Sequence, residues 1–163
     1  MACYQKPNWF TAKVANPAVQ FFIKRFGMSP AGAQVLEVRG RKSGKTHTVP
    51  VNPIEVEGHR YLVAPRGETQ WVRNFRVAGE GVLRVGKRAE HIVGREIPDV
   101  DKPPILKAYL DRYHWEVGSQ FGVPKDATLA QLADIAPNHP VFVIHAREFA
   151  KGDDGLGSSP YDA

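Results

Sequence analysis

Residues 34–56 have the sequence QVLEVRGRKSGKTHTVPVNPIEV, in which apolar side chains alternate with polar ones on both sides of a basic turn. The apolar positions lie within residues 35–38 before the turn and within residues 49–56 after it. A period of two is typical of β-strands, whose successive side chains point to opposite faces. We therefore expect antiparallel strands on both sides of residues 40–46.

Strands and helices continue beyond this segment, separated by short turns. We expect strands at residues 61–64, 82–85, 88–97 and 141–144, helices at residues 71–78 and 128–135, and a loop at residues 118–125. Pro103-Pro104 opens a further helix, on which Leu106, Tyr109, Leu110 and Tyr113 recur at helical spacing. About six closely spaced strands with peripheral helices predict a mainly β, α+β fold, a small closed or half-closed antiparallel barrel.

Length and composition indicate one globular domain. The chain has 163 residues, of which 42% are hydrophobic and 24% charged. We expect residues 1–150 to form that domain and residues 151–163 to be a disordered tail. Cys3 is the only cysteine, which excludes internal disulfides and cysteine-rich zinc sites and indicates a reducing compartment. With no signal peptide or spanning stretch, the protein is expected to be cytoplasmic, at most peripheral to the inner membrane.

An amphipathic helix is expected near the start of the chain, where Asn16-Pro17 provides a cap followed by proline. Its apolar stripe consists of Val19, Phe22, Ile23 and Phe26, and it is flanked by Trp9, Lys13, Lys24 and Arg25. Cations beside an apolar stripe suit docking on an anionic bilayer, so residues 1–27 are a candidate membrane contact. The alternative is a helix packed on the core, which is the commoner use of such a stripe.

Charge is divided unevenly along the chain. Residues 1–97 hold 16 Lys and Arg against 7 Asp and Glu, a net +9, whereas residues 98–163 hold 6 against 10, a net −4. This excess indicates that the first half faces an anionic partner such as nucleic acid, a lipid surface or a phosphorylated small molecule. A general bias toward solubility is the alternative.

The basic turn is itself a candidate anion site. The segment Gly40-Arg41-Lys42-Ser43-Gly44-Lys45-Thr46 supplies cations, a hydroxyl and the backbone amides that two glycines expose. It is not a Walker phosphate loop, because three residues rather than four separate its glycines and a strand is expected after it. His47, at the edge of the turn, is the one histidine that we associate with this site. A solvated hairpin turn is the alternative interpretation.

A second candidate segment, residues 65–74, follows the end of an expected strand, where functional loops commonly lie. Arg66 and Arg73 add cations, and Gly67 permits close approach of the backbone to a ligand. Trp71 offers a flat face for a ring system, and a buried core anchor is its alternative role.

No metal site and no enzyme nucleophile are expected. The histidines, at positions 47, 59, 91, 114, 139 and 145, lack both the helical spacing and the cysteine partners of a metal site. There is no Gly-x-Ser-x-Gly elbow and no complete dinucleotide fingerprint. Tyr109 and Tyr113 are candidate catalytic residues because a phenol can donate a proton in a pocket, although tyrosines at helical spacing more often pack in a core.

At the two candidate segments the sequence resembles the deazaflavin-dependent nitroreductase and quinone reductase family of actinobacteria. The marks of that family are a Gly-Arg-Lys-Ser/Thr-Gly turn, here residues 40–44, and a Gly-Glu-x-x-Trp-x-x-Asn stretch, here residues 67–74. The resemblance implies a split β-barrel that binds the reduced coenzyme F-420, a phosphorylated, polyglutamylated and strongly anionic hydride carrier. Such a ligand would account for the positive first half of the chain.

The resemblance also implies roles for particular residues. Arg41, Lys42, Ser43, Gly44 and Lys45 would meet the phosphate and tail, and Arg66, Gly67 and Trp71 would line the coenzyme pocket, with His47 and Arg73 as further cofactor-binding candidates. His47 replaces an arginine of some members, and Asn52 replaces a tyrosine. The active-site tyrosines of nitroimidazole-activating members lie in a stretch that differs here. Activation of nitroimidazoles is therefore not expected.

The implied reaction is hydride transfer from C5 of the reduced deazaflavin to an electron-poor acceptor, a quinone or an activated enone, with a proton from Tyr109, Tyr113 or solvent. No metal is required. Two alternatives remain: an oxidoreductase of the same barrel type that binds flavin mononucleotide (FMN), and a basic nucleic-acid-binding barrel without catalysis. A nucleic-acid-binding barrel should carry exposed aromatics on its strands, and only Tyr61 lies in the first five, so no nucleic acid is expected as a partner.

Overall fold

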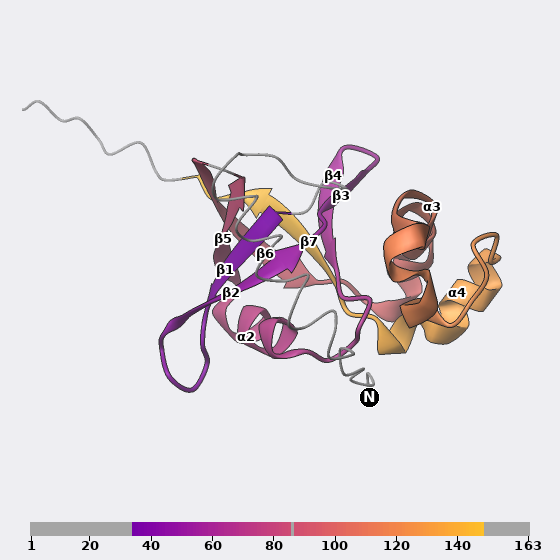
Figure 1. Cartoon of the computed structure of the whole chain (residues 1–163), viewed down its shortest axis with the longest axis horizontal. Helices are drawn as coiled ribbons and strands as arrows, with labels where there is room; N and C mark the ends of the chain where they lie inside the picture. The colour runs from indigo at the N-terminus through magenta and orange to yellow at the C-terminus, as the bar shows by residue number, and fades with distance from the viewer. Residues whose placement is uncertain (1–33, 86, 149–163) are drawn as a thin grey trace, which may run out of the picture.

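A computed structural model describes residues 34–85 and 87–148 of the chain as one antiparallel sheet with helices packed on two sides (Figure 1). The strands are β1 (Gln34–Arg39), β2 (Thr46–Val51), β3 (Ile54–Val56), β4 (His59–Val63), β5 (Glu80–Val85), β6 (Arg88–Glu96) and β7 (Val141–Ala146). The helices are α2 (Gln70–Ala78), α3 (Lys102–Phe121) and α4 (Leu129–Ile135), with short 3₁₀ turns η3 (Asp99–Asp101) and η4 (Ala136–Asn138). The expected N-terminal helix and C-terminal tail lie outside the described residues.

The two edge strands of the sheet are neighbours in the sequence. The strand order is β2-β1-β5-β6-β7-β4-β3. In a flat sheet of these seven strands the edges would lie about 29 Å apart, at about 4.8 Å per spacing. The link between them, Asn52 and Pro53, can span at most about 11 Å. The sheet therefore has to curl until its edges approach, and it forms the expected antiparallel half-barrel (Figure 1).

The same link explains why the structure has seven strands where the sequence predicted about six. Asn52-Pro53 interrupts the alternating run of residues 49–56, and proline cannot donate a ladder hydrogen bond. Val51 therefore ends a strand that pairs with β1, and Ile54 begins one that pairs with β4.

Helix α2 packs on the sheet through Phe75, which is fully buried. The Phe75 ring meets that of Phe142 on β7 edge-on, with the centroids 5.1 Å apart. A Cβ added at Gly94 would lie 2.7 Å from Phe75 Cε1, and one at Gly81 would lie 3.5 Å from Phe75 Cε2. Gly94 of β6 therefore leaves the room that lets α2 approach the sheet closely, whereas a Cβ at Gly81 of β5 would be in ordinary contact with the Phe75 ring.

Helix α3 lies beside β3 and β4 at the other end of the half-barrel, and α4 packs on α3 (Figure 1). The helix expected after Pro103-Pro104 is confirmed, and so is the one at residues 128–135, which Thr128 and Gln131 begin with a capping box. The loop expected at residues 118–125 is wrong in its first part, because α3 continues to Phe121. Gly122, with φ of +66°, then ends the helix in the left-handed conformation that glycine favours. No helix within the described ranges is both long and apolar enough to cross a bilayer.

Candidate functional site

The basic turn between β1 and β2 is closed by its own backbone hydrogen bonds. The Gly40 N–H donates to Lys45 O at 2.8 Å, and the Gly44 N–H donates to Gly40 O at 2.9 Å. Gly44 has φ of +69°, a conformation that few side chains tolerate. Ser43 Oγ accepts from the Lys45 N–H at 3.2 Å. The turn is thus defined by its backbone, and the side chains of Lys42 and Lys45 are exposed with no ion pair to any described residue.

Arg41 joins this turn to α2 and so brings the two candidate segments together. Arg41 Nη1 donates to Gln70 Oε1 at 2.9 Å and to Asn74 Oδ1 at 2.8 Å. The backbone N–H of Arg41 donates to the same Asn74 oxygen at 3.2 Å. The segments are about thirty residues apart in sequence, yet they form one surface. The side chains of Gln70 and Asn74 were not predicted to take part, because the contact depends on how α2 packs.

His47 and Arg39 flank the turn from β2 and β1. A Cβ added at Gly40 would lie 2.8 Å from both His47 Nε2 and Ser43 Oγ, so the absence of a side chain there lets these two groups close over the turn. A Cβ added at Gly44 would lie 3.8 Å from Arg39 Nε and Nη2. Arg39 is therefore a further cation of this site that sequence reasoning missed. Its position directly before the glycine of the turn was the available signal.

The segment before α2 holds a buried polar group without a hydrogen bond. Gly67 is buried with φ of +79°, and its N–H donates to Ala64 O at 3.1 Å. Thr69 occupies the N-cap position of α2, yet its side chain does not cap the helix, and Thr69 Oγ1 is buried with no partner in the described structure. Arg66 is half-buried in the same loop. An orphaned hydroxyl beside uncapped amides at a helix start is suited to an acceptor supplied by a ligand.

The predicted site residues Arg73 and Trp71 have partners inside the protein. Arg73 Nε lies 3.5 Å from Glu68 Oε2, and Arg76 Nη2 lies 2.7 Å from Glu68 Oε1. The hydrogen bond from Arg76 holds the pKa of the Glu68 carboxyl below its usual range. Trp71 is half-buried, with its ring centroid 5.9 Å from that of Phe142. Trp71 thus contributes to the core, and its contact with a ring system of the coenzyme stays a prediction.

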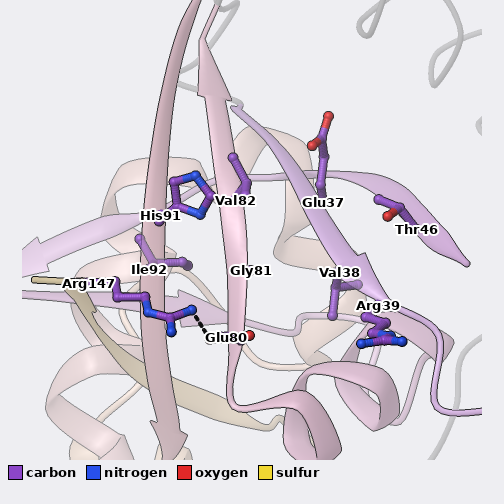
Figure 2. Close-up of a pocket in the computed structure, with 10 residues that line it drawn as sticks. All are labelled: Glu37, Val38, Arg39, Thr46, Glu80, Gly81, Val82, His91, Ile92 and Arg147. Carbon is purple, nitrogen blue, oxygen red and sulfur yellow. Dashed lines mark hydrogen bonds and ion pairs between the residues drawn. The ribbon is translucent and has the colours of Figure 1, made fainter. Parts of the chain in front are cut away.

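A pocket of about 170 Å³ lies on the sheet, lined mainly by residues of β1, β5 and β6 (Figure 2). Glu37 and Arg39 alternate along β1 with Leu36 and Val38, which belong to the core under α2, so the pocket opens on the other face of the sheet. The ion pair of Arg147 and Glu80, 2.6 Å long, lies at one end of the pocket, and Arg39 lies at the other (Figure 2). Since small-molecule sites usually exceed about 300 Å³, the pocket is large enough for part of a coenzyme only.

Tyr109 and Tyr113 lie in the core beneath α3 rather than at the basic turn. Both are at most 2% exposed, and their ring centroids are 4.9 Å apart. The Tyr113 hydroxyl donates to Pro53 O at 3.2 Å, which ties α3 to the link between the sheet edges. The core-packing alternative therefore describes their position, and a proton-donor role stays a prediction. Among the described residues, no three His, Cys, Asp or Glu side chains gather as a metal site.

His139, which sequence analysis did not single out, supports the loop that carries Arg66 and Gly67. It is 2% exposed, its ring packs on Phe121 with centroids 4.6 Å apart, and its Nδ1 lies 3.4 Å from Ala64 O. Burial lowers the pKa of His139 below its ordinary 6.5, so the ring is neutral at neutral pH.

The family model described as F420H(2)-dependent quinone reductase matches residues 23–116, which include the basic turn, the Arg66 loop and α2. This match covers more than half of the chain. No curated protein matches the sequence.

Solved structures with a similar fold have low sequence identity to the chain. An F420-H2 dependent reductase (FDR-A) is similar over 70% of this chain and 94% of its own, with 19% identity and a TM-score of 0.48. A protein of unknown function from Agrobacterium tumefaciens is similar over 87% of this chain and 58% of its own, with 14% identity and a TM-score of 0.51. The heme storage protein HutZ from Vibrio cholerae covers 82% of this chain and 90% of its own, with 8% identity and a TM-score of 0.49. The A. tumefaciens likeness bears on the fold alone.

Proposed function

Since the chain belongs to the F-420-dependent quinone reductase family, we propose that it transfers a hydride from the reduced deazaflavin coenzyme F-420 to an electron-poor acceptor, a quinone or an activated enone. The family makes the chain an oxidoreductase. The observation that carries the proposal is the junction of the basic turn with α2 through Arg41 and Asn74, because it gathers on one surface the cations that an anionic coenzyme needs.

The residues at this junction fit such a coenzyme. Lys42 and Lys45 in the turn, and Arg39 on the strand before it, have no hydrogen-bond or ion-pair partner for their side chains within the described residues, so their charges are available to phosphate and carboxylate groups. The orphaned Thr69 Oγ1 and the first amides of α2 offer polar contacts beside Gly67. We propose that the turn holds the phosphate and tail, and that Arg66, Gly67 and Trp71 line the ring.

When bound, the reduced deazaflavin supplies the hydride, so the protein has to bind, orient and shield the reacting groups. Lys42 and Lys45 would hold the anionic end of the coenzyme, while Trp71, anchored on Phe142, would limit how its ring can lie. The Tyr113 hydroxyl already donates to Pro53 O. We therefore favour solvent as the source of the acceptor's proton.

The alternatives differ in what they require of the same surface. An FMN-binding reductase would use one phosphate, for which the turn offers more cations than are needed. A nucleic-acid-binding barrel would stack bases on exposed rings. Of the Phe, Tyr and Trp residues on described strands, Phe142 is buried and Tyr61 is half-buried against α3 and its neighbours, which disfavours stacking.

The proposal is tested by mixing the purified protein with reduced F-420 and a short, soluble quinone, and following the return of the oxidised coenzyme's absorbance. We expect enzyme-dependent oxidation that saturates in both substrates. The matched control replaces the coenzyme with reduced FMN at the same concentration. Oxidation of reduced FMN at the same rate, or none with reduced F-420, would contradict the proposal.

A further inference from the structure

Two neutral side chains of α2 hold Arg41. Gln70 Oε1 and Asn74 Oδ1 both accept from Arg41 Nη1, at 2.9 and 2.8 Å, and Asn74 Oδ1 also accepts from the Arg41 backbone N–H. Residues 70 and 74 lie on one face of α2, one helical turn apart. The side chain and the backbone of Arg41 are thus both fixed to the helix.

The chemistry of this contact differs from that of other arginines in the described structure. The side chains of Arg60, Arg73, Arg76, Arg84 and Arg147 each reach a carboxylate. A carboxylate neutralises the guanidinium charge, whereas a side-chain amide accepts the hydrogen bond and leaves the charge in place. Arg41 is therefore held in position while no carboxylate among the described residues compensates its charge.

Asn74 is chosen for this contact rather than for packing. Asn74 is 5% exposed, and the other two buried residues of α2, Val72 and Phe75, are apolar. A buried amide is tolerated where its polar atoms are bonded, and an apolar side chain at this position could not accept from Arg41.

We propose that Gln70 and Asn74 are positioning residues that preorganise Arg41 for a phosphate group, that of the coenzyme, an inference that rests on the proposed function. Arg41 Nε and Nη2 have no partner within the described residues, and this edge can form the two parallel hydrogen bonds by which a guanidinium binds phosphate. Holding the side chain in advance reduces the conformational entropy lost on binding.

The decisive variant is Gln70→Glu. Gln70 is exposed, so the change is compatible with folding, and a glutamate keeps the acceptor but neutralises Arg41. We expect unchanged or higher thermal stability, affinity for F-420 lower by about tenfold, and weaker dependence of that affinity on salt. In an Arg41→Ala background the same change should have little further effect. The matched control is Val77→Glu, which adds the same charge to the other end of α2, where Val77 is 69% exposed, and should bind as wild type.

Two results would overturn the inference. One is wild-type affinity for F-420 in Gln70→Glu. The other is an equal loss of affinity from Gln70→Glu with and without Arg41. Either result would show that Gln70 does not act on coenzyme binding through Arg41. A second variant, Asn74→Leu, tests the contact without the coenzyme. Its effect on thermal unfolding should be smaller in the Arg41→Ala background, where only the hydrogen bond from the backbone N–H remains, and full additivity would show that the two side chains do not act together. Failure of the wild-type protein to bind F-420 would instead overturn the proposed function, and the role of Arg41 in binding the coenzyme with it. The thermal unfolding of the single and double variants at Arg41 and Asn74 would still decide whether these two residues fix the turn to α2.

Discussion

Replacing either exposed lysine of the basic turn by alanine is expected to weaken coenzyme binding without changing stability. Lys42 and Lys45 have no ion-pair partner among the described residues, so their removal leaves no carboxylate unpaired. A hydrogen bond to a charged group contributes about 1.5 to 3 kcal/mol, which corresponds to a dissociation constant for F-420 raised about 12- to 150-fold. The free energy of unfolding should stay within about 0.5 kcal/mol of wild type, as for exposed sites in general.

The assay is a titration with F-420, followed optically at several salt concentrations, beside thermal unfolding of each variant. The contacts are ionic and partly exposed, so wild-type affinity should fall as salt rises, and it should fall less steeply in Lys42→Ala and Lys45→Ala. The matched control is Arg60→Ala, in which the guanidinium removed is the one bonded to Glu90 at 2.7 and 2.8 Å. That variant should lose stability and keep its affinity for the coenzyme.

A role of the two lysines in binding the coenzyme would be refuted if the lysine variants bound F-420 as tightly as wild type. It would also be refuted if they lost affinity and stability in parallel, because the turn would then have a structural role only.

Other expectations concern stability and the N-terminal segment. Because burial keeps the pKa of His139 below its ordinary 6.5, the unfolded chain binds the proton first, and the free energy of unfolding should fall by up to about 1.4 kcal/mol per pH unit below 6.5. His139→Leu should remove this slope in denaturant titrations, and a slope that persists would mean that another group causes it. Gly94→Ala should destabilise by about 1 to 3 kcal/mol because its Cβ would lie 2.7 Å from Phe75, and Phe75→Leu should restore part of the loss in thermal unfolding. Unchanged stability in Gly94→Ala would contradict the close contact of Phe75 with residue 94. Residues 1–27 are proposed as a membrane contact, so their deletion should abolish sedimentation with anionic vesicles while reduction of a short quinone persists. If the deletion unfolds the protein, or if the intact chain does not bind vesicles, the alternative of a helix packed on the core would be favoured.

The strands and helices could be predicted where the pattern is local. Alternation located β1 and β2, and the proline pair located the start of α3. The two edges of the sheet could not be identified in this way, because periodicity says nothing about which strand Val51 or Ile54 will pair with. The end of α3 was also predicted wrongly. Glycine and polar residues near position 118 suggested a loop, whereas the helix continues to Phe121.

The candidate site was predictable in its residue types and not in its contacts. The cations of residues 40–46 are visible in the sequence, but the hydrogen bonds from Arg41 to Gln70 and Asn74 depend on how α2 packs on the sheet at Gly94. Asn74 ends the Gly-Glu-x-x-Trp-x-x-Asn stretch of residues 67–74, but nothing in the local sequence indicates which group its side chain bonds, and an asparagine on a helix is usually solvated.

Selectivity for the deazaflavin is tested most directly by titrating the purified protein with F-420 and, separately, with FMN, each followed by its change in absorbance or fluorescence. We expect F-420 to bind far more tightly, since Arg39, Lys42 and Lys45, which have no partner within the described residues, offer more charge than a single phosphate can use. Equal affinity for the two, or protein that is purified yellow with FMN and does not bind F-420, would contradict it.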